Sequence, residues 1–352
     1  MNKDYLILGA GHQGLAMAAH FKLDDNNVFL WNRTKENIES LIKNRDIKVK
    51  GIINDTVTLD KVSSNIEDVL SKNIFIATPA SAHSALAKLL APLVDSDTII
   101  VLNPGRTLGC IDFKKELIKN GCKNLPMIAE TQTIIYTCRK NSDNEVQIYT
   151  FKNEVEISSF NKVELDIIYD RLPDCFKKYL LKVDSMINTS IGNVGMILHP
   201  LTTLLNISKI ESDNEFKFYY EGITPSISTL LEELDSERLL IAEKLGVSIS
   251  STMKWMQDTY KIEGDNLYNT VRNNMYYKDI YGPSSINTRY IDEDVPFGLV
   301  TLEAIGKLVD VSIPMTSLVI DLANKVMNKD YRIIGRLATE DDIIKLKGDN
   351  YG

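Results

Sequence analysis

Residues 5–14 read YLILGAGHQG, and this stretch decides the fold. Four apolar residues form a short strand that runs directly into Gly9, and Gly11 and Gly14 complete a GxGxxG pattern. Good helix formers follow from Leu15, so the glycines stand between a strand and a helix, as a dinucleotide-binding turn requires. The pattern predicts a Rossmann-type domain with a pyrophosphate at the helix N-terminus.

Each glycine of this turn has its own expected task. Gly9 makes the tight turn, Gly11 lets the backbone approach the pyrophosphate, and Gly14 allows close packing of the helix. His12 and Gln13 lie within the same turn and are expected to contact the cofactor. The alternative is a chance triplet of glycines, which the strand-to-helix setting disfavours.

Outward from this turn, the first 110 residues alternate apolar runs with amphipathic segments. The further strands are expected at residues 28–31, 74–77 and 98–102. This rhythm predicts a parallel sheet wound with helices. Extended runs between residues 126 and 160 suggest further strands that enlarge the sheet, so the dinucleotide-binding domain is expected to span residues 1–185.

The second half has a helical pattern instead. Between Leu230 and Leu245 apolar residues recur at three-to-four spacing, and Gly246 ends the run. The same spacing returns over residues 299–308 and 318–326. The fold class is therefore α/β: a Rossmann-type domain with an extended sheet, followed by an all-helical C-terminal domain over residues 186–352. The tail from Gly348 is expected to be frayed.

The composition of the 352 residues excludes several classes of protein. Forty Lys and Arg stand against 48 Asp and Glu, a net charge of −8, which opposes binding to nucleic acid. No apolar run approaches a membrane span, and the N-terminus lacks a signal-peptide pattern, so a cytoplasmic protein without a membrane partner is expected. The four cysteines have no spacing typical of a metal site or a disulfide framework and are expected to be reduced thiols.

The end of the second strand bears on the choice of nucleotide. NAD-binding sites usually place an acid here for the ribose 2′-hydroxyl, but this chain has Asn32, Arg33 and Thr34. Arg33 offers a charge-assisted fork to a 2′-phosphate, and its neighbours offer neutral donors. NADPH is therefore the expected cofactor, with NADH as the alternative. A solvated basic turn is the plain alternative for these residues.

Two further strand ends carry polar loops on the edge where open α/β sheets bind ligands. Thr78 and Pro79 follow one strand, and Asn103 follows the next. A cofactor role is expected for all three, although their glycine and proline neighbours by themselves predict only turns.

His199 is the histidine with the most suggestive position. It precedes Pro200 where the sheet domain gives way to the helical one, and a seam of this kind is where two-domain dehydrogenases bind substrate. Proline suits the first turn of a helix, so His199 is expected at a helix start or kink. Taken by itself, a histidine beside apolar residues is more often structural.

The polar loop over residues 281–298 has an alternative of the same kind, a solvated connection with local salt bridges.

The order of several short motifs resembles the opine dehydrogenase family, which includes octopine, nopaline and N-(1-carboxyethyl)amino-acid dehydrogenases. The segments that carry the resemblance are residues 9–14 (GAGHQG), 102–106 (LNPGR), 129–133 (AETQT), 136–139 (YTCR), 198–200 (LHP) and 289–299 (RYIDEDVPFGL). The likeness runs over nearly the whole chain. It departs from the family at Gly195 and at the pair Ile134 and Ile135, which leaves the amine pocket open to change.

The resemblance implies an activity and roles for four residues. The family joins an amine to a 2-oxo acid by reducing the imine that they form. His199 would be the acid–base group, Asp294 its charge partner, Arg289 a clamp for the substrate carboxylate, and Thr133 a lining residue of the oxo-acid pocket. The chemistry agrees, because imine formation needs a group that titrates near neutrality and a guanidinium can hold a carboxylate through two donors.

Two other functions stay open at this stage. A ketone-reducing enzyme of the same architecture, of the ketopantoate reductase or glycerol-3-phosphate dehydrogenase type, would depend on a lysine in the helical domain, and no lysine here stands in a comparable motif. A nucleotide-sensing protein without catalysis is the second alternative. The expected partners are an amino acid or amine and a 2-oxo acid, with no metal, and the helical domain could also pair into a homodimer.

Overall fold

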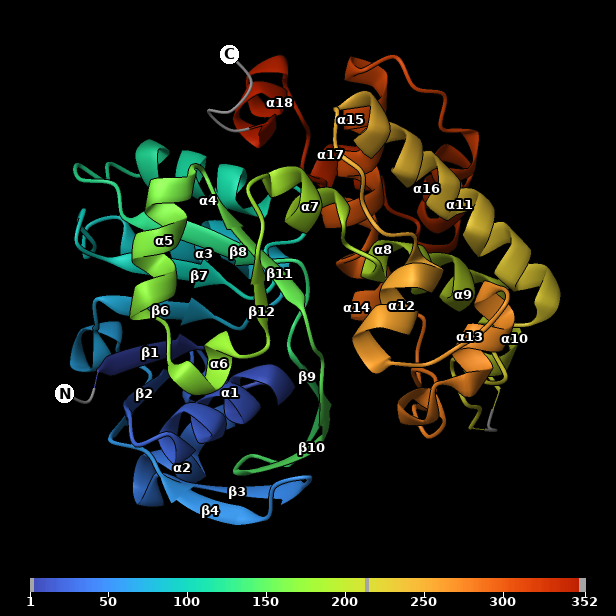
Figure 1. The fold of residues 1–352 in the computed structure, drawn as a ribbon. Helices are drawn as coiled ribbons and strands as arrows, with labels where there is room; N and C mark the ends of the chain where they lie inside the picture. The colour runs from blue at the N-terminus through green and yellow to red at the C-terminus, as the bar shows by residue number, and fades with distance from the viewer. Residues whose placement is uncertain (1–2, 213–214, 348–352) are drawn as a thin grey trace. The chain divides into compact units, whose positions relative to one another are not determined.

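The chain forms two units, each built around its own core (Figure 1). The structure is a computed structural model and describes residues 3–212 and 215–347, so the tail from Gly348 lies outside the described residues. The first unit comprises Met1–Gly105 and Gly109–Ser185, and the second comprises Arg106–Leu108 and Met186–Gly352. The sequence alone assigns residues 106–108 to the first domain, whereas in the structure they pack with the second.

An eight-stranded sheet forms the centre of the first unit. In spatial order its strands are β12 (Leu180–Lys182), β11 (Val155–Ser159), β8 (Met127–Thr131), β7 (Ile99–Leu102), β6 (Asn73–Ile76), β1 (Asp4–Leu8), β2 (Asn27–Trp31) and β5 (Lys61–Ser63). All neighbours run parallel except β8 and β11. The chain leaves β1 toward β2 and returns on the other side at β6, so the winding direction reverses between β1 and β6. Ligands of doubly wound sheets bind at such a switch point.

The central strands are apolar because helices cover both faces of a parallel sheet. All four residues of β6 and of β7 are buried, as are Tyr5 to Leu8 of β1. Such strands form near-continuous apolar runs instead of alternating ones. This is why these strands could be predicted from the sequence.

A second sheet corrects one prediction. Its order is β4 (Asp55–Thr58), β3 (Asp46–Gly51), β10 (Glu145–Phe151) and β9 (Tyr136–Ser142). The runs at residues 134–136 and 146–149 were expected to enlarge the main sheet, but Tyr136 begins β9 and residues 146–149 lie in β10 of this separate sheet, while residues 134 and 135 precede the strand. In β10 the buried Val146 and Ile148 alternate with less buried residues, which indicates a one-sided strand but not which strand it pairs with. Its parallel partner is β3, far upstream in the sequence.

Helix α1 (His12–Leu23) lies between the two sheets (Figure 1). It packs on β1 and β2 of the large sheet and on all four strands of the small one. Every residue from Gly14 to Phe21 is buried, including His20, as expected of a helix covered on all sides. The remaining α-helices of this unit are α2 (Glu39–Asn44), α3 (His83–Leu90), α4 (Gly109–Lys119), α5 (Lys162–Arg171) and α6 (Asp174–Lys177).

The second unit is helical, as predicted. Its helices are α7 (Met186–Ile191), α8 (Gly195–Leu198), α9 (Pro200–Leu205), α10 (Ile207–Ile210), α11 (Pro225–Lys244), α12 (Thr252–Tyr260), α13 (Leu267–Asn273), α14 (Arg289–Asp292), α15 (Val300–Leu308), α16 (Pro314–Met327), α17 (Tyr331–Ile334) and α18 (Glu340–Lys347). Within the described residues it contains no sheet strand, only one isolated pairing of Lys217 with Tyr281. The long helix α11 starts where Thr224 accepts a bond from the Ile227 amide.

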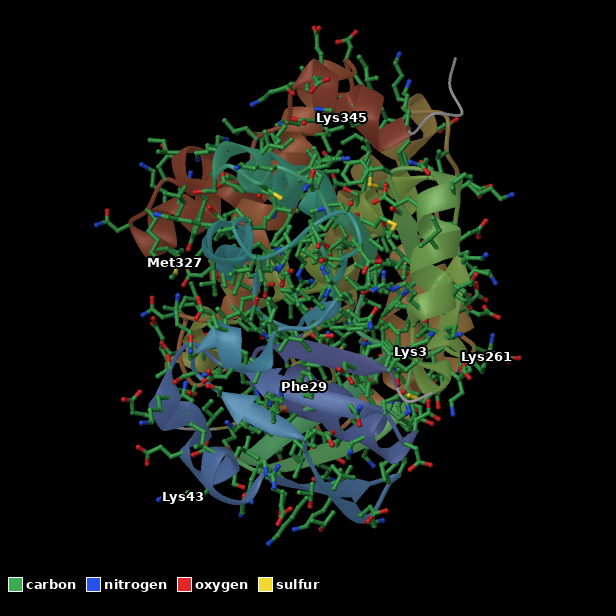
Figure 2. The ribbon with its side chains drawn as sticks, turned by 90° about the vertical axis from the view of Figure 1, so that its left-hand side faces the viewer. Lys3, Phe29, Lys43, Lys261, Met327 and Lys345 are labelled. Carbon is green, nitrogen blue, oxygen red and sulfur yellow. The ribbon has the colours of Figure 1, made fainter. Side chains whose placement is uncertain are left out.

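The surfaces carry dispersed charge, and exposed lysines such as Lys43, Lys261 and Lys345 are labelled in Figure 2. Across residues 3–212 and 215–347, none of the helices combines the length and the apolar composition needed to span a bilayer. The four cysteines all lie in this part of the chain, and no disulfide joins any two of them.

Candidate active site

The glycine-rich turn lies at the switch point of the large sheet. Gly9 has a φ of +111°, and a Cβ there would lie 2.8 Å from Cγ2 of Thr78. A Cβ on Gly14 would lie 1.8 Å from the Gly9 carbonyl oxygen, so helix and turn pack with no room for a side chain. Around Gly11 no described atom lies within 4 Å of the Cβ position. The three glycines therefore provide a tight turn, an open backbone and close packing.

Direct contacts join this turn to the other strand ends singled out from the sequence. The backbone amide of Ala10 donates to Oδ1 of Asn32, 3.2 Å away at the end of β2. The side-chain amide of Gln13 donates to the Asn103 carbonyl oxygen after β7. Residues from three loops thus meet at one edge of the sheet.

His12 is held by the second sheet. Its Nδ1 accepts the backbone amide of Lys140 on β9 at 2.6 Å. The ammonium of Lys140 lies 3.4 Å from the Ala10 carbonyl oxygen, which brings a positive charge to the turn. Lys140 could not be predicted to lie here, because it belongs to a strand of the second sheet, which the sequence pattern did not indicate.

The turn and its neighbours fit an anionic dinucleotide. Oγ1 of Thr78 and Nδ2 of Asn103 are buried, and neither finds a hydrogen-bond partner among the described residues. No side chain caps α1 at Gly11, and the first turn of this helix holds no acid, so its positive end faces outward uncompensated. Buried donors without partners are rare and call for an acceptor.

Three of the cofactor candidates outside the glycine-rich turn are exposed. Arg33 and Thr34 follow β2, and Pro79 precedes a short 3-10 helix, η3 (Ala80–Ala82). Asn32 uses one N–H of its amide to donate to the Thr34 carbonyl oxygen at 2.8 Å, which shapes this loop. Arg33 and the nearby Lys35 are both exposed, and they supply the charged donors of this segment.

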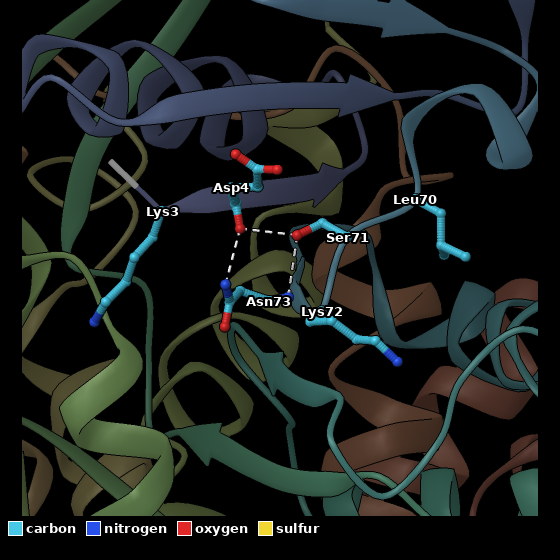
Figure 3. Close-up of a pocket in the computed structure, with 6 residues that line it drawn as sticks. All are labelled: Lys3, Asp4, Leu70, Ser71, Lys72 and Asn73. Atoms are coloured by element: carbon cyan, nitrogen blue, oxygen red, sulfur yellow. Dashed lines mark hydrogen bonds between the residues drawn. The ribbon is translucent and has the colours of Figure 1, made fainter. Parts of the chain in front are cut away.

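An open pocket of about 440 Å³ lies at the opposite end of the strands, where β1 and β6 begin (Figure 3). The polar groups that line it bond to one another: the Asp4 carbonyl oxygen accepts from Ser71 at 2.8 Å and from Asn73 at 2.9 Å. Ligands of open α/β sheets bind beyond the carboxyl ends of the strands. The polar groups of this pocket therefore fix the sheet edge, and the candidate nucleotide site is the other end.

In the second unit, His199 and Asp294 form a direct pair. Nδ1 of His199 lies 2.7 Å from Oδ2 of Asp294. The side chain of Asp294 is 1% exposed and that of His199 is 14% exposed, so the carboxylate is enclosed while the imidazole keeps an accessible edge. Since a carboxylate only accepts, Nδ1 carries a proton and Nε2 is the atom that can exchange one.

Local backbone structure positions both partners. His199 lies at the junction of α8 and α9, where Pro200 occupies the first position of α9. Asp294 directly precedes a π-helix, η5 (Val295–Leu299), in which the Leu299 amide bonds back to the Asp294 carbonyl oxygen. Single π-helical turns are rare and occur often at functional sites.

Burial and neighbouring charges act in opposite directions on the pKa values of His199 and Asp294. Burial lowers the pKa of His199 below its ordinary value, while the Asp294 charge and hydrogen bond act against that shift. Burial opposes ionisation of Asp294, but Arg106, and after it His199, hold its pKa below the usual range. At neutral pH the carboxylate is ionised and the imidazole is mostly neutral.

Aromatic rings surround the imidazole. Tyr290 stacks on His199 with ring centroids 4.3 Å apart, and the Tyr219 hydroxyl lies 3.1 Å from Nε2. Tyr219 in turn stacks on Tyr277 at 4.2 Å. Since Nε2 is the unprotonated nitrogen, the Tyr219 hydroxyl donates to it.

Two predicted substrate residues are less closely tied to this pair. Arg289 begins α14, and its side chain is 57% exposed, with Nη1 3.9 Å from Oε2 of Glu293 and the guanidinium 5.6 Å from the Tyr290 ring centroid. Thr133 is half-buried between β8 and β9 of the first unit. The structure thus joins His199 to Asp294 and leaves the Arg289 guanidinium available to solvent.

The sequence alone assigns no role in this site to Arg106, Glu293 or Tyr219. Arg106 ion-pairs with Glu293 and Asp294, and Tyr219 bonds His199. Arg106 stands in the quoted motif at residues 102–106, whereas Tyr219 stands in none of the quoted motifs. Nothing in the local pattern indicates which partners these side chains reach.

Comparison with known proteins identifies the family. Residues 182–327 match the family described as NAD/NADP octopine/nopaline dehydrogenase, alpha-helical domain, and residues 5–104 match the ketopantoate reductase family PanE/ApbA. An opine dehydrogenase of Arthrobacter sp. (strain 1C) is 32% identical over 338 residues, which cover 95% of this chain and 94% of that protein. The chain belongs to the opine dehydrogenase family. The ketopantoate match is confined to the nucleotide-binding half.

Solved structures of the family share the fold. Octopine dehydrogenase with NADH and L-arginine superimposes with a TM-score of 0.75 at 17% identity, over 97% of this chain and 93% of that one. The same enzyme has been solved with NADH and pyruvate, with a TM-score of 0.73 at 16% identity over 99% of this chain and 94% of that one. Yersinopine dehydrogenase with NADP⁺ gives 0.72 at 14% identity over 97% and 95%.

Family membership confirms the resemblance and the fold class predicted from the sequence. The chain is an oxidoreductase of the opine dehydrogenase type, which acts on a CH–NH group, takes a nicotinamide dinucleotide and uses small-molecule substrates. No finding favours the ketone-reducing or nucleotide-sensing alternatives.

Proposed function

We propose that this opine dehydrogenase joins an amino acid or related amine to a 2-oxo acid with NADPH as reductant, and that His199 is its acid–base group. The observation that carries the proposal is the 2.7 Å pair of His199 and Asp294 in a chain of this family. The amine nitrogen replaces the carbonyl oxygen of the oxo acid, which leaves as water, and the resulting C=N bond takes up one hydride and one proton. The reduced nicotinamide supplies the hydride when it is bound.

The proton transfers fall to Nε2 of His199. Condensation removes a proton from the amine and delivers one to the departing oxygen, and the imine nitrogen must be protonated to accept a hydride well. Asp294 fixes the tautomer at Nδ1, so Nε2 can both accept and return a proton. The Tyr219 hydroxyl, at 3.1 Å, holds the place next to Nε2 that a substrate group would take.

Arg289 is the proposed clamp for the substrate carboxylate. Its guanidinium is exposed and only loosely paired with Glu293, so its donors can still form two parallel bonds to a carboxylate. Thr133 is proposed to line the oxo-acid pocket, on the family resemblance alone.

NADPH in preference to NADH is supported by the second strand end. Arg33 is exposed there, and Asn32 replaces the acid that would repel a 2′-phosphate. The cofactor candidates of the first unit are Gly9, Gly11, His12, Gln13, Gly14, Asn32, Arg33, Thr34, Thr78, Pro79 and Asn103. Relatives of this fold have been solved with NADH and with NADP⁺, so the choice depends on these residues. The cytoplasmic location and the homodimer stay predictions.

The test is a coupled substrate assay. NADPH oxidation is followed with a 2-oxo acid alone and then with a panel of amino acids, and the product is identified by mass spectrometry. Oxidation that requires both substrates and yields a secondary amine is the expected result. Oxidation without an amine would favour a ketone reductase, and nucleotide binding without turnover on any pair would favour a sensor. Repeating the assay with NADH decides the cofactor.

A further inference from the structure

The segment Arg106–Leu108 belongs to the second unit, although along the chain it lies between two stretches of the first unit. Its two end residues have φ of +63° and +59°, values that bulky side chains rarely adopt. The Thr107 amide donates to the Phe297 carbonyl oxygen at 3.2 Å, and the Leu108 amide donates to Oγ of Ser190 at 2.6 Å. Backbone of this kind persists only where its surroundings determine it, and it gathers at functional sites.

The Arg106 side chain is directed at the candidate active site. It is 10% exposed, and its Nε lies 3.1 Å from Oε1 of Glu293 while Nη1 lies 3.3 Å from Oδ1 of Asp294. Nη1 also bonds Oδ1 of Asn193 at 3.2 Å. His199 bonds the other oxygen of Asp294, so the carboxylate has a hydrogen bond at Oδ2 and an ion pair with Arg106 at Oδ1.

Charge balance explains why a cation is needed here. Glu293 and Asp294 are successive acids, 5% and 1% exposed, and two neighbouring buried carboxylates cannot both stay ionised without compensation. Arg289 reaches Glu293 only at 3.9 Å and is mostly solvated. Arg106 is the charged group with the largest effect in holding the pKa of Asp294 low.

We propose that Arg106 is the positioning residue of the His199–Asp294 pair. It orients Asp294 toward Nδ1 of His199 and balances the charge of the second acid, Glu293. The pair of His199 and Asp294 therefore exchanges a single proton in the pH range in which the enzyme works. This inference rests on the proposed acid–base function of His199. It assigns Arg106 no contact with substrate, because the guanidinium is buried and its bonds go to protein acceptors.

The charged and titratable groups around the His199 imidazole determine in which direction its titration midpoint moves in each variant. Burial disfavours the imidazolium, Asp294 favours it, and Arg289 and Arg106 oppose it. Burial raises the pKa of Tyr219, so its hydroxyl brings no charge. In Arg106→Gln the pair loses the positive charge of Arg106 while the acid Glu293 stays beside it, so the pair binds its proton at higher pH, by roughly one unit or more. In Arg106→Lys the charge is kept without the fork, so the midpoint stays close to the parent's.

The measurement does not depend on turnover. The His199 imidazole is titrated by NMR in the full chain without substrates, and its signal is assigned by its loss in His199→Gln. The basic limb of kcat/KM against pH is recorded in parallel. Glu293→Gln should move the midpoint the opposite way, and the double variant Arg106→Gln/Glu293→Gln should return it near the parent's value.

The matched control is Arg238, a buried arginine of the same unit that pairs with Asp235 at 2.7 Å. Arg238→Gln should lower thermal stability without moving the His199 midpoint. A midpoint in Arg106→Gln equal to the parent's, or moved equally in Arg106→Lys, overturns the proposal. If Arg106→Gln does not fold, an unmoved midpoint in Glu293→Gln overturns it instead. Absence of turnover in the parent chain would refute the proposed function and leave the titration to decide on Arg106.

Discussion

Replacing Asp294 by asparagine should cost the enzyme most of its activity at neutral pH. Asp294 is 1% exposed and lies 2.7 Å from Nδ1 of His199, so the imidazolium loses an adjacent, poorly screened anion. A neighbouring opposite charge is worth about 1 to 3 pKa units, or roughly 1.4 to 4 kcal/mol. An asparagine side chain can also present its NH₂ group to Nδ1, which would favour the wrong tautomer.

The size of the loss follows from the His199 pKa. Burial already holds this pKa below 6.5, so at pH 7 the imidazolium is a minor form and its population falls tenfold with each further unit. We therefore expect kcat/KM at pH 7 to fall roughly 10- to 1000-fold, with the basic limb of the profile moved to lower pH.

The assay is NADPH oxidation with an amine and a 2-oxo acid across a pH series. Asp235→Asn is the matched control, because Asp235 is a buried acid of the same unit whose bonds go to Arg238 and Thr252. It should lose stability and keep its pH profile. An Asp294→Asn enzyme with kcat/KM within about threefold of the parent's and an unmoved profile would refute the acid–base reasoning.

Three further predictions concern other sites. Arg33→Ala should raise the KM for NADPH roughly 10- to 100-fold, the value of a lost charge-assisted bond, and leave that for NADH nearly unchanged; equal effects on both would remove the 2′-phosphate assignment. Arg289→Lys should raise the KM for the 2-oxo acid about tenfold because the fork is lost, and an effect limited to the amine would move Arg289 to the other pocket. Burial lowers the pKa of His20 to about 4 from 6.5, so the unfolded state binds the extra proton and stability falls as pH drops from 6.5 to 4. The loss is about 3 kcal/mol, and His20→Gln should abolish this component in denaturant unfolding measured across that pH range; an unchanged slope would contradict it.

Much of the first unit could be predicted because its signals are local. GxGxxG between a strand and a helix identifies the turn, and the buried runs of β6 and β7 are apolar throughout. The pairing of the strands β9 and β10 could not be predicted in this way. The alternation in β10 indicates a one-sided strand, but its pairing with β3 is a long-range choice that no local pattern encodes.

The same limit applies to the candidate active site. His199 could be singled out by its proline and its position, and Asp294 only through a family resemblance. Arg106 could not be linked to either, since its partners lie far along the chain and its backbone conformation depends on the packing around it. Residue types can be read from a motif, whereas a charge network is visible only after folding.

The crossing of the segment Arg106–Leu108 has a consequence for any attempt to exchange parts between relatives. A chimaera joined at residue 185 would inherit its helical half from one parent and the arginine that serves this half from the other. The activity of such chimaeras should therefore depend on whether the segment Arg106–Leu108 and the acids Glu293 and Asp294 come from the same parent enzyme. The sequence that builds the second unit is discontinuous, so a recombination library should use two more crossover points than a single boundary at residue 185 suggests.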